Sequence, residues 1–157
     1  MNGDVYSGNW CQDWRSGKGS YTFFELGDFY SGEWVDDRRS GLGEYLYKDK
    51  ANYLGEFLKD QKSGKGRLLW ANGNEYVGDW KNDFKNGEGV FRFASGNLYE
   101  GEFSDGEFEG KGVFTFADGR SYRGDFRVGV FHGHGVLMDK NGKVMFDGNW
   151  ENDQPKA

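Results

Sequence analysis

Residues 76–98 read YVGDWKNDFKNGEGVFRFASGNL, and this stretch decides the fold because the rest of the chain repeats its pattern. It opens with the frame Tyr-x-Gly-x-Trp, runs through a polar segment into Gly-x-Gly, and ends in a glycine turn. The frames begin at Tyr6, Tyr30, Tyr53, Tyr76, Tyr99, Tyr122 and Phe146, which are 24, 23, 23, 23, 23 and 24 residues apart. So steady a period predicts an array of one small repeat. Function is then expected on an extended surface rather than in a catalytic pocket.

Side chains in each repeat alternate with a period of two, which is the period of a β-strand. Tyr76, Gly78 and Trp80 fall on one strand face, and the aromatic residues after Gly-x-Gly alternate in the same way. Two such strands, joined by the six residues 81–86, make one hairpin per repeat. Asn-Gly, Ser-Gly and Asp-Gly pairs between repeats suit hairpin turns with positive φ. The sequence therefore predicts an all-β chain, an elongated single-layer twisted antiparallel sheet of consecutive hairpins.

Glycine normally weakens a strand, so its place beside aromatic residues needs a physical reason. An aromatic ring from the neighbouring strand that lies over the bare backbone would shield it. We expect this contact in every repeat. The 27 glycines are therefore positional, and they do not indicate a disordered chain.

One turn between repeats departs from the pattern, since Lys50 stands where the others have glycine. A lysine with positive φ costs on the order of 1 kcal/mol. We expect a positive φ at Lys50 and the most distorted turn of the array around it.

Composition and charge narrow the function classes. The net charge of −6 disfavours nucleic acid as a partner. The single cysteine, Cys11, cannot form an internal disulfide, which fits a reducing compartment. No apolar run approaches the roughly 20 residues of a spanning helix, and the N-terminus lacks the apolar region of a signal peptide. A cytoplasmic protein is expected.

Catalytic, cofactor and metal sites are not predicted, so we expect no enzyme. His132 and His134 have no cysteine or acidic partner at metal-ligand spacing. Residues 17–20, Gly-Lys-Gly-Ser, lack the adjacent Gly-Lys-Ser/Thr of a phosphate-binding loop, and the Gly-x-Gly pairs lie within predicted strands.

The chain resembles a MORN (membrane occupation and recognition nexus) repeat protein. The resemblance rests on the Tyr-x-Gly-x-Trp frame, the polar segment, Gly-x-Gly and the glycine turn, and it runs from Tyr6 to Trp150. It implies one MORN array over residues 1–157, a single sheet of six to seven consecutive β-hairpins with an incomplete last repeat. MORN arrays serve as scaffolds in ciliary, cytoskeletal and membrane-junction proteins, and they occur in lipid kinases and lysine methyltransferases. The resemblance thus implies assembly or recognition without saying which.

Both ends of the sequence fall inside a repeat. Residues 2–6 match a turn between repeats, and residues 150–157 stop inside the next hairpin. Repeat arrays normally end in polar caps. We therefore expect either a segment of a longer array or open sheet edges that pair with another molecule, giving a homodimer or a longer array.

Aromatic residues are the first candidates for partner binding. A single-layer sheet has no second layer to cover its aromatic face, which suggests a groove for a helical or extended peptide. The alternative, that the rings only shield glycine and one another, stays open. The candidates on the face are Tyr30, Trp34, Tyr53, Phe57, Tyr76, Trp80, Tyr99 and Phe103. Four further rings are expected at loop tips: Trp14, Phe84, Phe108 and Phe131.

Charged residues recur once per repeat in two rows. A basic row in the loops is a candidate for lipid head groups: Arg15, Arg39, Lys62 and Lys85. Aspartates two residues earlier in the same loops largely cancel its charge. An acidic column faces away from the aromatic rings and is expected to fix strand register through cross-strand pairs. Its positions are Asn9, Glu33, Glu56, Asp79, Glu102, Asp125 and Asn149.

These features favour a non-enzymatic scaffold without cofactors. It would bind protein partners, or itself, through the aromatic face in a cytoskeletal, ciliary or membrane-associated assembly. Two alternatives stay open: a phospholipid-binding module peripheral at a membrane surface, and the regulatory repeat region of a larger enzyme.

Overall fold

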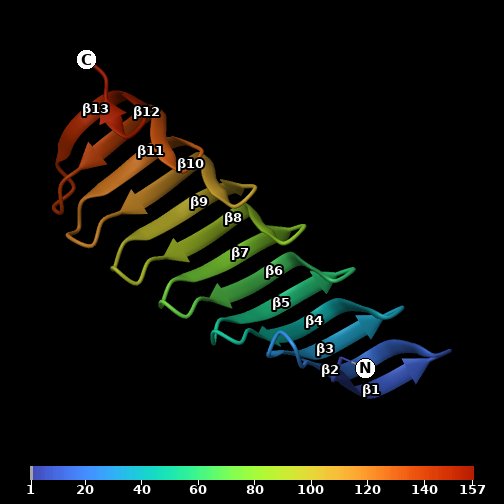
Figure 1. The fold of residues 1–157 in the computed structure, drawn as a ribbon. Helices are drawn as coiled ribbons and strands as arrows, with labels where there is room; N and C mark the ends of the chain where they lie inside the picture. The colour runs from blue at the N-terminus through green and yellow to red at the C-terminus, as the bar shows by residue number, and fades with distance from the viewer. Residues whose placement is uncertain (1) are drawn as a thin grey trace. The chain divides into compact units, whose positions relative to one another are not determined.

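The computed structural model describes residues 2–157 and is all-β over that range. Fourteen strands follow one another in chain order in a single open antiparallel sheet. Figure 1 shows them as successive hairpins. The prediction of one antiparallel sheet of consecutive hairpins is confirmed. Over residues 2–157 the chain has no helix that is long and apolar enough to span a membrane.

The described residues form two compact halves. The N-terminal half contains the residues up to Gly73 together with Asp79–Asp83, and the C-terminal half contains Asn74–Gly78 and Phe84–Ala157. The first half holds β1 (Val5–Cys11), β2 (Trp14–Phe23), β3 (Asp28–Val35), β4 (Arg38–Leu46), β5 (Asn52–Leu58) and β6 (Gln61–Leu69). Strand β7 (Glu75–Lys81) contributes residues to both halves. The second half holds β8 (Phe84–Arg92), β9 (Leu98–Ser104), β10 (Glu107–Thr115), β11 (Ser121–Arg127), β12 (Val130–Met138), β13 (Val144–Glu151) and β14 (Gln154–Pro155).

The turn inside each repeat is two residues long, so the prediction of a six-residue loop is wrong. Both residues of the turn have positive φ, as at Asp36 (47°) and Asp37 (68°). This geometry is that of a type I′ turn, whose twist matches that of the flanking strands. The residues after the turn therefore belong to the next strand. Four aromatic residues predicted at loop tips lie on strands instead: Trp14, Phe84, Phe108 and Phe131.

A β-bulge that recurs in five hairpins, β1–β2, β3–β4, β5–β6, β9–β10 and β11–β12, explains the first glycine of Gly-x-Gly. The pairing of β3 with β4 shifts register between Gly32 and Trp34, and Gly41 has a φ of 86°. Glu33 closes the bulge, because its carboxylate accepts the backbone N–H of Leu42 at 2.5 Å.

The acidic column therefore acts mainly on the backbone. The bulge contact recurs when Glu102 accepts the N–H of Lys111 at 2.5 Å and Asp125 accepts that of His134 at 3.1 Å. Ion pairs to the neighbouring strand add to it, as between Lys111 and Asp125. Glu33, Glu102 and Asp125 thus bond to the backbone at the bulge, and the predicted cross-strand pairing is present between Lys111 and Asp125; its role in fixing register stays a prediction.

The second glycine of each pair lies under a tyrosine ring. A Cβ on Gly135 would lie less than 3.0 Å from the ring of Tyr122, closer than real Cβ atoms approach. A Cβ on Gly124 would meet the Cα of Gly135 at 2.5 Å. The same arrangement pairs Gly19 with Tyr6, Gly43 with Tyr30, Gly66 with Tyr53, Gly89 with Tyr76 and Gly112 with Tyr99. The predicted shielding of glycine by a ring is confirmed.

The core of the sheet is the row of frame tyrosines. Tyr30, Tyr53, Tyr76, Tyr99 and Tyr122 are each 0% exposed. Their hydroxyl groups are satisfied internally; that of Tyr122 donates to the carbonyl of Asp125 at 2.8 Å. Burial raises the pKa of Tyr122 to about 12, since a buried phenolate would lose its hydration.

Lys50 has a φ of 74°, as predicted, but the turn around it is regular. The N–H of Tyr47 donates to Ala51 at 3.0 Å, and the N–H of Lys50 donates to Tyr47 at 2.9 Å. The turn that ends at Gly96 has the same pair of bonds. The turn that contains Gly27 has a different hydrogen-bond pattern, because the N–H of Gly27 donates to the carbonyl of Phe23, four residues earlier. The predicted distortion at Lys50 is therefore wrong, because the lysine adopts the left-handed conformation that the turn requires.

Two glycine substitutions in the C-terminal half test the close approach of the ring. Gly135→Ala should destabilise the chain by about 3 kcal/mol, because its methyl group overlaps Tyr122. Gly142→Ala should cost about 1 kcal/mol, because Gly142 has a φ of 82° but nothing within 4 Å of a built Cβ. Urea unfolding measures both, and equal losses would contradict the ring-on-glycine account.

Candidate partner-binding surface

The frame rings that were predicted to bind a partner are core residues. Tyr30 and Tyr53 are fully buried, and Trp34 is 3% exposed. The other predicted rings of this set are buried as well: Phe57, Tyr76, Trp80, Tyr99 and Phe103. A second level of side chains covers them, and these covering residues form the accessible aromatic side of the sheet. The prediction that the frame rings contact a partner is therefore corrected.

One residue per repeat does much of this covering. It stands two residues after the two-residue turn, and we call it the cover position. Its occupants are Arg15, Arg39, Lys62, Lys85, Phe108 and Phe131. The predicted basic row and two of the predicted loop-tip aromatics are thus the same structural position.

In the N-terminal half the cover position holds an ion-paired cation. The Nε of Arg15 lies 2.6 Å from Asp37 of the following repeat, and its guanidinium carbon lies 4.5 Å from the ring centroid of Trp34. Arg39 pairs with Asp60 at 3.1 Å in the same way. The hydrogen bond from Arg15 lowers the pKa of the Asp37 carboxyl.

The pairing of these cations with aspartates argues against the hypothesis that they bind lipid head groups. Only 19% of the Arg15 side chain and 15% of the Lys62 side chain are exposed, and Lys62 lies 3.7 Å from Asp83. Their partners are aspartates of the next repeat, not those of the same loop as predicted. Lys85 lies over Phe91 at 5.3 Å, and desolvation lowers its pKa. These cations are committed to the fold, which leaves them poorly placed to meet lipid phosphates.

At two of the three cover positions of the C-terminal half phenylalanine replaces the cation, whereas Lys85 keeps it. Phe108 stacks on Tyr99 with ring centroids 3.9 Å apart, and Phe131 stacks on Tyr122 at the same distance. The turn residue that donates its N–H to the carbonyl of Phe108 is Gly129, where the N-terminal half has aspartate. At Phe108 both the cover residue and the turn residue are therefore uncharged, whereas Phe131 keeps an aspartate, Asp153, in the equivalent turn.

Five half-buried phenylalanines form one continuous patch in this half, the phenylalanine surface: Phe93, Phe108, Phe114, Phe116 and Phe131. Phe108 lies 6.3 Å from Phe93 and 6.4 Å from Phe114, and Phe131 lies 5.9 Å from Phe114 and 6.2 Å from Phe116.

A hollow of about 370 Å³ opens in this patch, lined by Phe114, Phe116, Phe126, Gly129, Phe131 and Asp153. Sequence reasoning named Phe108 and Phe131 but missed three members. Their signal was the alternation of aromatic residues after Gly-x-Gly.

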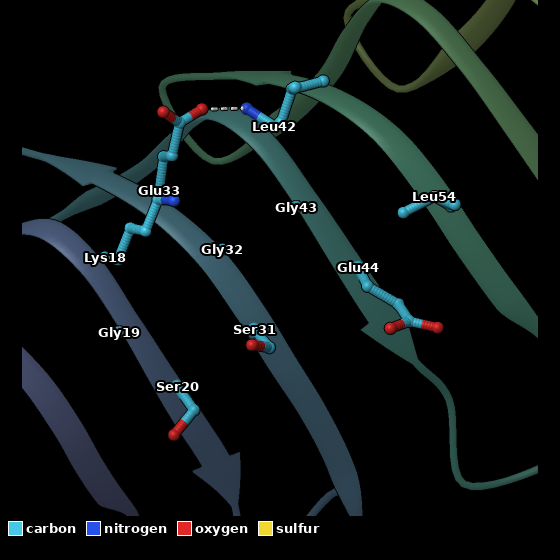
Figure 2. A pocket seen from close by; sticks show the side chains of 10 residues that line it. All are labelled: Lys18, Gly19, Ser20, Ser31, Gly32, Glu33, Leu42, Gly43, Glu44 and Leu54. Atoms are coloured by element: carbon cyan, nitrogen blue, oxygen red, sulfur yellow. Dashed lines mark hydrogen bonds between the residues drawn. The ribbon is translucent and has the colours of Figure 1, made fainter.

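The opposite face of the sheet carries polar side chains and scattered exposed leucines, such as Leu42 and Leu54. Figure 2 shows a hollow of this face in the N-terminal half, where Glu33 reaches the N–H of Leu42 and Ser20 and Ser31 lie along neighbouring strands. No histidine or cysteine lines it. Over residues 2–157 no three His, Cys, Asp or Glu side chains are grouped so as to hold a metal ion.

Two predicted aromatic candidates remain exposed. Trp14 and Phe84 are each 55% exposed, at the first position of their strands. Trp14 borders a hollow with Val35 and Leu58. Their role as partner contacts stays a prediction.

The repeated hairpin, with tyrosine over glycine and a bulge at Gly-x-Gly, defines a single-sheet β-repeat protein. The family model described as MORN repeat matches residues 6–24, 30–51, 53–75, 76–98, 99–119 and 122–144. The chain therefore belongs to the MORN repeat family, as its frames predicted. A search of the curated proteins finds no significant match.

Solved structures of similar fold include two of the same domain from Drosophila melanogaster. The TCP domain of SAS-4 (dCPAP), in complex with a proline-rich motif of Ana2 (dSTIL), aligns with a TM-score of 0.52 and 17% identity, over 85% of this chain and 73% of that chain. The TCP10c domain of Sas-4 aligns with a TM-score of 0.51 and 16% identity, over 95% of this chain and 88% of that chain. At such identity the likeness concerns the fold alone.

Removing a cover cation tests its contribution to the fold. Arg15→Met keeps an apolar stem over Trp34 but loses the ion pair with Asp37, so we expect a loss of about 1 kcal/mol at neutral pH. The pKa of Asp37 is lowered in the folded chain, so its contribution is present above its unfolded pKa and is lost as pH falls through the folded value.

Arg15→Met should therefore unfold with less acid dependence below about pH 4 than the unmodified chain. Urea unfolding at a series of pH values measures this. Arg38→Met is the control, because Arg38 is exposed beside the cover position. An equal effect of both variants would contradict the assigned role of Arg15.

Proposed function

We propose that this MORN chain is a non-enzymatic scaffold that binds a protein segment at the phenylalanine surface of its C-terminal half. The observation that carries the proposal is the continuous patch of half-buried rings around a hollow, in which Phe108 and Phe131 stand at cover positions that hold ion-paired cations in the N-terminal half. Contiguous apolar patches on a soluble surface mark interaction sites. Aromatic residues are also enriched in the buried centres of protein interfaces.

Two further considerations support a protein partner. The SAS-4 TCP domain, similar in fold, was solved with a proline-rich motif of Ana2. Three of the four cations expected to meet lipid head groups, Arg15, Arg39 and Lys62, are instead engaged with aspartates. We place the chain in the cytoplasm, in a cytoskeletal, ciliary or membrane-associated assembly of the kind that MORN arrays serve.

Selection from a random displayed-peptide library tests this function without assuming the partner. Peptides enriched on the chain should bind the Phe114→Ser, Phe116→Ser double variant at least tenfold more weakly, because this variant removes one wall of the hollow. Leu42→Ser with Leu54→Ser is the matched control, since both leucines are exposed away from the aromatic side.

Circular dichroism checks that each variant is folded. The proposal would be overturned by a selection that enriches no peptide. Peptides that bind the double variant as tightly as the unmodified chain, or that respond only to the leucine variant, would also overturn it.

A further inference from the structure

We infer that the phenylalanine surface recognises a proline-rich segment in the polyproline II conformation, which crosses the strands and seats one proline on each repeat. The inference rests on the proposed function and names the class of its partner. It commits to a spacing: prolines recur at every third residue of the ligand.

The spacing of the repeats carries this inference. Each repeat adds two strands, so equivalent rings recur at about 10 Å across the sheet. A polyproline II helix has three residues per turn and advances ~9.3 Å per turn. Phe108 and Phe131 occupy equivalent positions in successive repeats, so one turn of the ligand matches one repeat. An extended β-strand repeats its side-chain direction at about 6.6 Å and would lose register.

The orientation of the rings suits a flat ligand group. Phe108 lies at 13° to Tyr99 and Phe131 at 8° to Tyr122, so each cover ring turns one face to its tyrosine and the other to the open side. A pyrrolidine ring can lie flat on such a face, and polyproline II ligands dock in aromatic-lined grooves because little entropy is lost.

The size of the hollow favours a polyproline II ligand over an α-helical one. The hollow of about 370 Å³ beside Phe114 and Phe131 admits a proline and its neighbours. An α-helix with its side chains is 10–12 Å across, so it would rest on the rim. Gly129 keeps the hollow open, because it contributes no side chain to the lining.

Charge specifies the residues between the prolines. Asp153 lines the hollow, and the carboxylate of Glu107 would lie 3.0 Å from a Cβ built on Gly129. Both negative groups lie beside the Gly129 turn. Arg120 bounds the apolar surface elsewhere, lying over Phe116 at 4.7 Å. Arginine or lysine between the prolines would therefore meet Asp153 and Glu107.

The N-terminal half shows which substitution would remove the phenylalanine surface and still allow the repeat to fold. Asp153 stands where Asp37 and Asp60 stand, and it already accepts the backbone N–H of Phe131 at 2.8 Å. Arg15 and Arg39 show the arrangement that an arginine adopts over the frame rings Trp34 and Phe57. Phe131→Arg should thus fold as the N-terminal repeats do and present a paired cation instead of a ring.

Fluorescence anisotropy with labelled synthetic peptides tests the inference. Two peptides have the same length and composition of proline, arginine and serine, one with proline at every third residue and one at every fourth. The first should bind at least tenfold more tightly than the second. Phe131→Arg should weaken its binding at least tenfold, and Leu42→Ser with Leu54→Ser should leave it unchanged. Replacing the peptide's arginines with glutamate should also weaken binding.

Equal binding of the two spacings would overturn the inference, as would unchanged binding to a folded Phe131→Arg. If that variant fails to fold, Phe116→Ser supplies the same comparison. Library peptides that bind the phenylalanine surface as helices, or without proline, would overturn the inference but leave the proposed function standing. If both the peptide selection and the anisotropy measurement fail, the proposed function and the inference are both overturned.

Discussion

A tyrosine ring pressed against a bare glycine backbone is the contact on which this sheet depends. Tyr122 covers Gly135, and no side chain larger than hydrogen fits beneath the ring. Gly124 lies opposite Gly135 on the neighbouring strand. It must also be glycine, because the two strands leave no room there for a Cβ. The ring gains full burial, its hydroxyl is satisfied by a backbone carbonyl, and the weakness of glycine in a strand is offset. Repetition of this contact gives the sheet a core without a second layer.

Such a core still needs a cover, and the chain provides two chemically different ones. In the N-terminal half Arg15 and Arg39 lie over the rings, and each pairs with an aspartate of the following repeat. The same side chain therefore covers the rings and links two repeats. In the C-terminal half Phe108 and Phe131 stack on the tyrosines and make an apolar exterior. The frame determines the fold, and the cover position determines whether the aromatic side carries a paired cation or a phenylalanine ring. The proposed function therefore depends on residues that the repeat pattern leaves free.

Much of the fold follows from sequence because its rules are local. The period of two identifies the strands, the steady repeat identifies the hairpins, and a lysine in a glycine turn requires the positive φ found at Lys50. The two-residue turns escaped prediction because pairs such as Asp36-Asp37 lack the glycine that usually marks a type I′ turn. That error moved Phe84, which follows the turn Asn82-Asp83, from a strand to a loop tip. The pairing of Arg15 with Asp37 was also missed, because it joins residues 22 apart across two repeats.

The proton chemical shifts of the Gly135 Hα atoms test the ring-on-glycine contact most directly. Protons over the face of an aromatic ring are shielded, so both resonances are expected well upfield of those of Gly142, which has nothing within 4 Å of a built Cβ. Replacing Tyr122 with leucine should return them to ordinary strand values. Gly135 Hα resonances at ordinary strand positions in the unmodified chain would contradict the account.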